Sequence, residues 1–432
     1  MNLTEIEREI LLAVARQKVA DEGVERLRLL LGSDARWETL IESAWRHGVA
    51  PLMCWHISRV DGGGLIPAAI RHSLRQCYVR AAFRNSFHIG QLALALRALA
   101  DGGVGVIVLK GAHLAPLVYG DPALRPFADI DLLVCPGDVD RALILLAGAG
   151  YDLAPGLLSV ALNRRYHVNL PLLKRGDRPV HVELHWRLTD RFSSHAMEHE
   201  AIWARSREVQ IGGAPARVLA PEDLVVYLAL HLDKHGYLNR GVVGSGRERA
   251  FALDGLSANR LIWFTDLHEV CERHGGALDW GTVVERSRTW GMADSVGTSL
   301  AMLVALLGTI VGDGALKALG GGTAGWFRRW LAGRLSHSGC GARDRTRDFV
   351  RRMMLPTRKD FELRLVRLLD LGEFLFPGRG SCPARATWGA GKILAHAIRG
   401  MAMCVGLMAG VLGCHARARF ARLMGAGGHD RG

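Results

Sequence analysis

Cysteine pairs of the Cys-x-x-Cys type are absent from this sequence of 432 residues, although it contains eight cysteines. Their irregular spacing in so long a chain is not that of a disulfide-stapled miniprotein, and predicts reduced thiols. A basic segment followed by an apolar one is also missing near the start, where residues 1–10 are acidic and amphipathic. No signal peptide is therefore expected, and together these absences favour a cytoplasmic protein.

Long apolar runs are missing as well. The most apolar segment, Gly400 to Cys414, is shorter than the roughly 20 residues that a membrane-spanning helix needs. Arg399 precedes this segment and several basic residues follow it. We expect a buried helix here, or a helix lying on a partner or on a membrane surface.

Acidic residues are scarce in the last quarter of the chain. Residues 325–432 contain 20 Lys and Arg but only 7 Asp and Glu, an excess that equals the formal net charge of the whole chain, +13. Biased genomic composition explains such an excess. The alternative is peripheral contact with a membrane or an acidic partner. No strong nucleic-acid-binding motif accompanies the basic residues.

What is present is an ordinary globular composition, 49% hydrophobic and 22% charged, enough for two to three domains. The first hundred residues have helical patterns. Apolar residues recur at helical spacing from Ile6 to Val14, and further helices are predicted over 27–31, from Asp34 to Gly48, and from Pro67 to about Leu99.

The pattern changes after residue 101, where short apolar runs alternate with helical segments. Strands are predicted over 104–109, 129–134, 166–173 and 180–186, and helices over 111–119 and 138–149. The last two strands form a hairpin, so the order is β-α-β-α-β-β, a small α/β unit. Helices are predicted again from Pro221, over 261–273 and over 280–291.

Two aspartates on one strand give the strongest chemical signal. Asp129 and Asp131 are two residues apart, so both point to the same face of the predicted strand. Two adjacent carboxylates repel each other, and beside a core they are costly unless a cation neutralises them. Mg²⁺ (or Mn²⁺) is the cation that carboxylate oxygens and phosphates share most readily. The alternative is that both aspartates are simply solvated at a strand edge.

Basic residues occur at both ends of the segment that leads from the predicted strand over 104–109 to Asp129. Lys110 and Gly111 stand at a strand-to-helix junction, where glycine lets the backbone approach an anion and the helix start attracts phosphate. Lys110 could supply a point charge to a phosphate, and Arg125 a bidentate contact. The three residues are therefore candidates for phosphate binding.

The strand over 180–186 alternates strictly and places His181, Glu183 and His185 on one face. Glu183 is a candidate third metal-facing carboxylate or base. His185, and His167 on the partner strand, are candidates for contact with substrate. His231 is followed by His235 at a spacing that can bind zinc, but the glutamate of metalloproteases is absent, so a structural or substrate-side role is expected.

These motifs resemble an uncharacterised family of bacterial nucleotidyltransferases within the polymerase-beta-like nucleotidyltransferase superfamily. The resemblance rests on Leu109-Lys110-Gly111, on Arg125 before Asp129-Ile130-Asp131, and on Glu183-Leu184-His185-Trp186. It extends over roughly residues 1–300. Two features depart from the wider superfamily: no serine follows Gly111, and seventeen residues separate Gly111 from Asp129.

The resemblance implies an NTP-dependent enzyme that moves a nucleoside monophosphate from an NTP, with ATP as the expected donor, to an acceptor hydroxyl. Asp129, Asp131 and Glu183 would hold Mg²⁺, with Glu183 alternatively taking the acceptor's proton. Lys110, Gly111 and Arg125 would hold the phosphates. Two alternatives remain: an inactive binding or regulatory protein on this fold, and a different phosphate or glycosyl transfer.

The implied fold class is α+β: a small nucleotidyltransferase-type mixed sheet with flanking helices, placed between all-helical regions. We predict four regions. These are an N-terminal helical region over 1–84, the α/β domain over 85–215, a helical domain over 216–300 that packs over the active site, and a basic, Arg-rich helical region over 301–432.

Overall fold

The computed structural model describes residues 3–61, 64–154, 160, 164, 167–189, 197–234 and 260–320. By its contacts the chain divides into two units, residues 1–157 with 163–340 and residues 158–162 with 341–432. Every element below belongs to the first unit. The basic region 325–432, the apolar segment 400–414 and His235 lie outside the described residues, so what we predict for them stays a prediction.

The N-terminal region is helical, as the sequence predicts. Its helices are α1 (Glu5–Ala13), α2 (Asp21–Leu31), α3 (Trp37–Arg46), α4 (Ala50–Val60) and α5 (Ala68–Asp101). A capping box begins α1, since the Thr4 hydroxyl accepts from the Glu7 N–H (3.2 Å) and the Glu7 carboxylate accepts from the Thr4 N–H (2.7 Å). The helix that we expected to begin at Asp34 begins at Trp37, and it stops before Gly48, whose φ of 75° no continuing helix allows.

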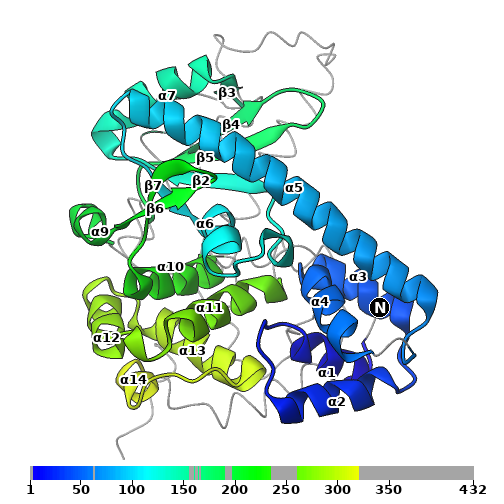
Figure 1. The fold of residues 1–432 in the computed structure, drawn as a ribbon. Helices are drawn as coiled ribbons and strands as arrows, with labels where there is room; N and C mark the ends of the chain where they lie inside the picture. Colours follow the sequence, from blue (N-terminus) through cyan, green and yellow to red (C-terminus); the bar gives the residue numbers. More distant parts are fainter. Residues whose placement is uncertain are drawn as a thin grey trace, which may run out of the picture. The chain divides into compact units, whose positions relative to one another are not determined.

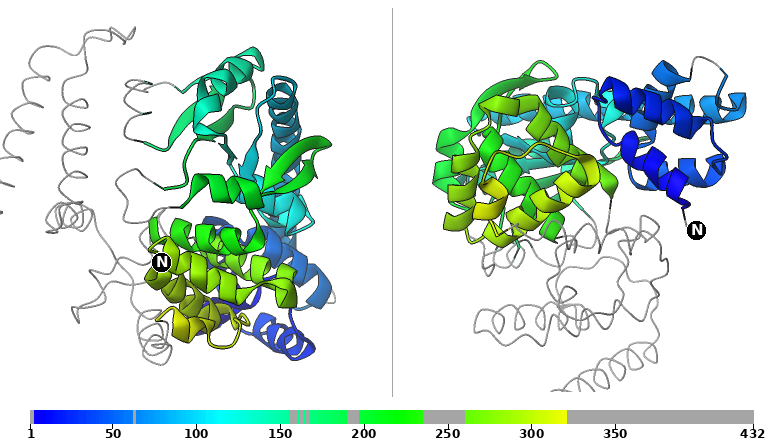
Figure 2. Two further views of the ribbon diagram at one scale, coloured as in Figure 1. Left: turned by 90° about the vertical axis from the view of Figure 1, so that its left-hand side faces the viewer. Right: turned by 90° about the horizontal axis from the view of Figure 1, so that it is seen from below.

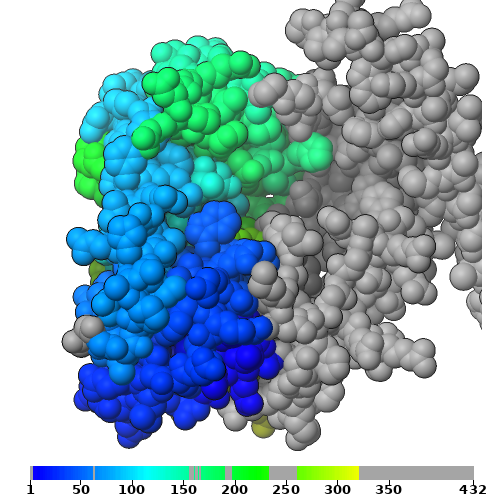
Figure 3. Space-filling view, turned by 90° about the vertical axis from the view of Figure 1, so that its right-hand side faces the viewer, coloured from blue at the N-terminus to red at the C-terminus, as the bar shows by residue number. Residues whose placement is uncertain are grey.

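The 34 residues of α5 make a helix about 50 Å long that begins directly after Pro67. It contacts α3 and α4 near its start and α7, β6 and β7 near its end. Figure 1 shows α5 running from the N-terminal helices to the sheet, and in the space-filling view of Figure 3 its side chains form a continuous light-blue ridge between these two parts.

A mixed seven-stranded sheet in the order β3-β4-β5-β2-β1-β7-β6 lies at the centre of the α/β part. The strands are β1 (Ile107–Leu109), β2 (Asp129–Leu133), β3 (Tyr151–Leu153), β4 (Asn169–Lys174), β5 (Val180–His185), β6 (Arg207–Ile211) and β7 (Ala214–Val218). The pairs β2/β5 and β1/β7 are parallel, and the other neighbours are antiparallel. The predicted α+β class and mixed sheet are confirmed.

The sheet contains three strands that the sequence patterns did not predict. β3 is only three residues long, and β6 and β7 form a hairpin whose turn residues, Gly212 and Gly213, both have positive φ. Because β7 runs to Val218, the boundary that we placed after residue 215 falls inside a strand.

Short helices connect the strands, and a helical layer follows them. The connecting helices are α6 (Lys110–Leu117), the 3₁₀ turns η1 (Pro122–Leu124) and η2 (Pro136–Asp138), α7 (Val139–Gly148) and α9 (His199–Arg205). The following elements are α10 (Pro221–Lys234), α11 (Leu261–His274), η4 (Gly275–Ala277), α12 (Trp280–Thr289), α13 (Ala293–Leu307) and α14 (Ala315–Ala318). Asp138 stands at the start of α7 as predicted, but its side chain caps no backbone N–H.

The apolar core joins these parts. One cluster of buried side chains includes Leu40 of α3, Leu109 of β1, Leu114 of α6, Leu228 of α10 and Leu303 of α13. α10 packs against α11, α12 and α13, and the left view of Figure 2 shows these green and yellow-green helices below the sheet. Within the described residues, no helix is both long and apolar enough to cross a bilayer.

Candidate active site

The parallel pairing of β2 with β5 brings the predicted carboxylates together. In this register Asp129 lies beside His181, Asp131 beside Glu183, and Leu133 beside His185. The alternation predicted for β5 is observed, because Val182 and Leu184 are buried on the opposite face. Parallel pairing of two strands so far apart in the chain therefore converts two separate motifs into one acidic surface.

Asp131 is the most enclosed of the three carboxylates. Its Oδ1 accepts a hydrogen bond from Lys110 Nζ (2.7 Å) and lies 2.9 Å from His185 Nε2. Burial alone would raise the pKa of Asp131, but Lys110 and His185 outweigh it and hold the pKa well below its usual range. Asp131 is therefore ionised at every physiological pH.

Glu183 lies between buried and solvent-facing groups. Its Oε2 accepts from Asn169 Nδ2 of β4 (2.7 Å) and lies 3.3 Å from His185 Nε2. Burial lowers the pKa of His185, whereas its hydrogen bonds to Asp131 and Glu183 raise it, and the net result is a raised pKa. With 36% of its side chain exposed, Glu183 can still reach a ligand or water.

Asp129 begins β2 and is exposed. Neighbouring protein nevertheless removes much of the water from its carboxylate, which raises its pKa, and the charge of Asp131 raises it further. Asp129 is thus the carboxylate with the most to gain from a cation. In the described part of the chain, the residues that bring ligand atoms within 4.8 Å of one another are Asp131, Glu183 and His185.

The donor set fits a hard divalent cation. Carboxylate oxygens are the ligands that Mg²⁺ and Mn²⁺ prefer, and those of Asp131 and Glu183 converge here, with Asp129 two residues before Asp131 on the same strand. His185, for which we predict contact with substrate, lies within this acidic group, and the substrate contact stays a prediction. Its first contacts are the carboxylates of Asp131 and Glu183.

Lys110 has an unusual backbone. Its φ of 44° makes it the one non-glycine residue with positive φ in the described ranges, a conformation that costs free energy in most residues. This turn lets the chain pass from β1 directly into α6 while the ammonium group points to Asp131. Burial lowers the pKa of Lys110, but Tyr227 and Asp131 raise it more, so the side chain stays charged.

Gly111 is required by close packing. A Cβ at this position would lie 2.5 Å from Arg125 Nη1 and 2.5 Å from Phe127 Cβ, a separation that no side chain tolerates. The start of α6 therefore presses against the loop that leads into β2. The role predicted for the Gly111 amide, phosphate binding, stays a prediction.

Arg125 points elsewhere than the sequence led us to expect. Its Nε and Nη2 donate to the two carboxylate oxygens of Asp266 on α11 (3.0 and 2.6 Å), and its Nη1 donates to the Pro126 carbonyl (3.1 Å). The Tyr119 hydroxyl donates to the same carboxylate (3.0 Å). This bidentate pair fixes the β2 loop to the helical layer, so the guanidinium is already engaged.

Sequence reasoning missed Tyr227. This buried side chain of α10 interacts electrostatically with Lys110, Asp131 and Glu183, and burial raises its own pKa. No local motif marks it, because only the packing of α10 over the sheet brings it here. His231 follows one turn later on α10, with its ring 5.0 Å from the Trp263 ring of α11.

His167 is exposed just before β4. The structure neither joins it to the acidic group nor places it in the core. Substrate-side roles for His167 and His231 stay predictions.

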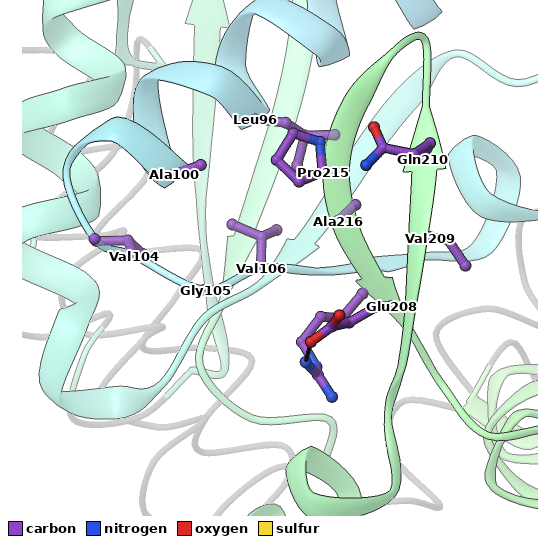
Figure 4. Close-up of a pocket in the computed structure, with 12 residues that line it drawn as sticks. Leu96, Ala100, Val104, Gly105, Val106, Glu208, Val209, Gln210, Pro215 and Ala216 are labelled. Carbon is purple, nitrogen blue, oxygen red and sulfur yellow. Dashed lines mark hydrogen bonds and ion pairs between the residues drawn. The ribbon is translucent and has the colours of Figure 1, made fainter.

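A cavity of about 450 Å³ lies in a different place, between the end of α5 and the β6/β7 hairpin. Figure 4 shows that small and apolar side chains such as Leu96, Val106 and Pro215 line it, together with the Glu208–Arg217 ion pair. None of the predicted site residues borders this cavity. The titratable groups that could perform chemistry gather on β2 and β5 instead.

A mixed sheet with an Asp-x-Asp strand beside a third carboxylate, and a lysine at the adjoining strand–helix junction, defines a transferase of the nucleotidyltransferase class. Residues 33–308 match the family described as "uncharacterised nucleotidyltransferase", and the chain belongs to this family. The reaction class, nucleotidyl transfer, follows from this membership, and it confirms the resemblance drawn from the motifs.

Solved structures show weaker likeness. The solution structure of the antibiotic-resistance factor ANT(2'')-Ia is 13% identical, with a TM-score of 0.30 over 48% of this chain and 92% of that one. A crystal structure of an antigenic nucleotidyltransferase-like protein from Paracoccidioides brasiliensis is 12% identical, with a TM-score of 0.30 over 54% of this chain and 97% of that one. No curated protein matches the chain.

Proposed function

We propose that the protein transfers a nucleoside monophosphate from an NTP, with ATP as the first donor to test, to a hydroxyl group of a small molecule, peptide or protein. The observation that carries this proposal is the β2/β5 register, which sets Asp131 beside Glu183 with Lys110 in contact. Three carboxylates and a permanently charged lysine suit a metal-bound triphosphate better than any neutral substrate.

Asp129 and Asp131 would hold Mg²⁺, or Mn²⁺ in its place, and Glu183 would either complete the set of ligands or take the acceptor's proton. When bound, the cation neutralises charge on the triphosphate and on the departing pyrophosphate. Asp131 is ionised and rigidly held, which suits a ligand. Asp129 is exposed, so its carboxylate could contact a cation that is bound together with the substrate.

The chain's own residues would supply orientation and proton transfer. The acceptor oxygen forms a bond to the α-phosphorus, and the bond from that phosphorus to the pyrophosphate oxygen breaks. In the second of these roles Glu183 accepts the hydroxyl proton on its carboxylate, which is 36% exposed and can return the proton to water. Lys110 would hold a phosphate oxygen with its charged ammonium group, assisted by the Gly111 amide.

Product mass tests the proposal. The protein is incubated with each NTP, Mg²⁺ and a panel of hydroxyl acceptors, and every product is weighed by mass spectrometry. The expected increment is one nucleoside monophosphate with release of pyrophosphate, and Asp129→Asn should abolish it. An increment of one phosphate, or of one hexose from a nucleotide sugar, would contradict the proposal, as would full turnover by Asp129→Asn.

A further inference from the structure

Three arginines from three different elements lie near one another, and two of them, Arg125 and Arg260, interact electrostatically with Asp129. Arg84 lies on α5, Arg125 in the loop before β2, and Arg260 directly before α11. Asn85, next to Arg84, donates Nδ2 to the Arg125 carbonyl (2.8 Å), and so ties α5 to this loop. Arg260 interacts electrostatically with Arg125, Arg84 and Asp129, so the three cations are neighbours.

Only one of these cations is neutralised by a bonded carboxylate. Arg125 has Asp266, whereas the ion pairs among the described residues leave Arg84 and Arg260 without one. Arg260 Nε is fully enclosed and has no hydrogen-bond partner. Burial lowers the pKa of both side chains, and the charge of Arg125 lowers that of Arg260 further. Arg84 is exposed and open to a ligand, whereas Arg260 is partly buried beside two other cations, which is unfavourable until an anion binds.

Arg260 is also held in a fixed place. The N–H groups of the next two residues, Leu261 and Ile262, donate to His47 Nδ1 (3.3 Å) and to the His47 carbonyl (3.0 Å). A Cβ on Gly48 would lie 3.0 Å from Arg260 Nη2, so the α3–α4 junction packs against the guanidinium. The N-terminal helices therefore position this cation for binding.

We propose that Arg84 and Arg260 bind the linear polyphosphate of the NTP beside Asp129, a task that the sequence suggested for Arg125. The proposal rests on the proposed function, because it names the donor-binding cations of the same site. Guanidinium groups match pairs of phosphate oxygens, and Arg84, being exposed, can offer its N–H groups to a ligand. Arg125 instead holds the loop before β2 in place through its ion pair with Asp266.

Binding of three probes tests the proposal: ATP, AMP and inorganic tripolyphosphate, each with Mg²⁺, measured by isothermal titration calorimetry. Arg84→Ala and Arg260→Ala should each weaken ATP and tripolyphosphate by at least about tenfold, the loss expected for a charge-assisted hydrogen bond, while AMP changes little. The matched control is Arg80→Ala. Arg80 lies one turn earlier on α5, is exposed, and hydrogen-bonds Gln76 of the same helix.

A second variant separates binding from folding. Arg260→Met keeps the aliphatic stem and removes an unpaired charge, so without ligand it should unfold at the wild-type temperature or above. A lower unfolding temperature would assign Arg260 to structure and overturn the proposal.

The binding results also separate this proposal from the proposed function. If wild type binds Mg·ATP and both arginine variants bind it equally well, the arginine assignment is wrong and the proposed function stands. If wild type binds neither an NTP nor tripolyphosphate, both are wrong.

Discussion

The carboxylates of α11 and those of β2 and β5 are both surrounded by charged partners, yet they are paired in different ways. Asp266 receives two hydrogen bonds from Arg125 and one from Tyr119, so each of its oxygens accepts at least one. Asp131 shares one oxygen with Lys110 and His185, while its neighbour Asp129 stays exposed. A closed pair serves the fold, and an open group of carboxylates can still accept a ligand.

The largest expected effect comes from changing the open group. Asp129→Asn should lower nucleotidyl transfer by about a thousandfold or more, because under the proposed function it removes a ligand of the cation and forfeits several kcal/mol of transition-state stabilisation. Its raised pKa means that the ionised carboxylate costs folding free energy above its usual titration range. The variant should therefore be as stable as wild type at pH 7, or more stable.

Activity assays beside urea unfolding check this prediction. A variant that loses transfer together with stability would show that Asp129 belongs to the fold. Asp129 would then serve the fold as Asp266 of α11 does, and the two groups of carboxylates would not differ in role.

Breaking the closed pair should act on stability instead. Asp266→Asn leaves the buried Arg125 charge without its counter-charge, which typically costs about 3–5 kcal/mol. Urea unfolding measures the loss, and Tyr119→Phe, which removes a single hydrogen bond, should cost only about 1 kcal/mol. If Asp266→Asn folds as stably as wild type, the pair does not fix the loop.

Glu269 sharpens the comparison within α11 itself. One turn after Asp266, it accepts a hydrogen bond from the Gln17 N–H (2.7 Å) but has no bidentate arginine. Burial raises its pKa to about 7 from the ordinary value of 4.5. The folded state therefore binds the proton more tightly than the unfolded state does. The free energy of unfolding has its full contribution from Glu269 below about pH 4.5, and this contribution is lost as the pH rises from 4.5 through 7.

Glu269→Gln should remove that fall. At pH 8 it should be more stable than wild type by about 3 kcal/mol, with little difference at pH 4. Unfolding free energies across this range provide the measurement. If the unfolding free energies of wild type and Glu269→Gln changed with pH in the same way, the raised pKa of Glu269 would be contradicted.

Gly111→Ala is the smallest change. The added methyl group would meet Arg125 and Phe127, and overpacking of this kind costs about 1–3 kcal/mol. The expected result is a lower denaturation midpoint in urea with an unchanged slope. Gly137→Ala is the control, since open space surrounds that position. Equal midpoints for the two variants would refute close packing at Gly111.

Local pattern predicted much of this site. The alternation of β5 and the Asp-x-Asp spacing placed Asp129, Asp131 and Glu183 on strand faces, and Pro67 and Pro221 marked helix starts correctly. These features depend on residues within a few positions of one another, where periodicity is informative.

What the sequence could not provide depends on partners far along the chain. The Arg125–Asp266 pair joins residues 141 positions apart, and Tyr227 reaches the site through the packing of α10. The positive φ of Lys110 is a backbone feature with no residue signature, since lysine rarely adopts it. Strand β3 has only three residues, and β6 and β7 are defined by their pairing with each other rather than by an apolar pattern.

Thermal unfolding with each NTP and Mg²⁺, for wild type and for Asp129→Asn, tests the central claim most directly. A donor at 100 times its dissociation constant should stabilise wild type by about 2.7 kcal/mol. The account predicts a Mg²⁺-dependent rise in unfolding temperature with at least one NTP, and its loss in Asp129→Asn. A folded wild-type protein whose unfolding temperature no NTP changes would contradict the assignment of β2 and β5 as a nucleotide site.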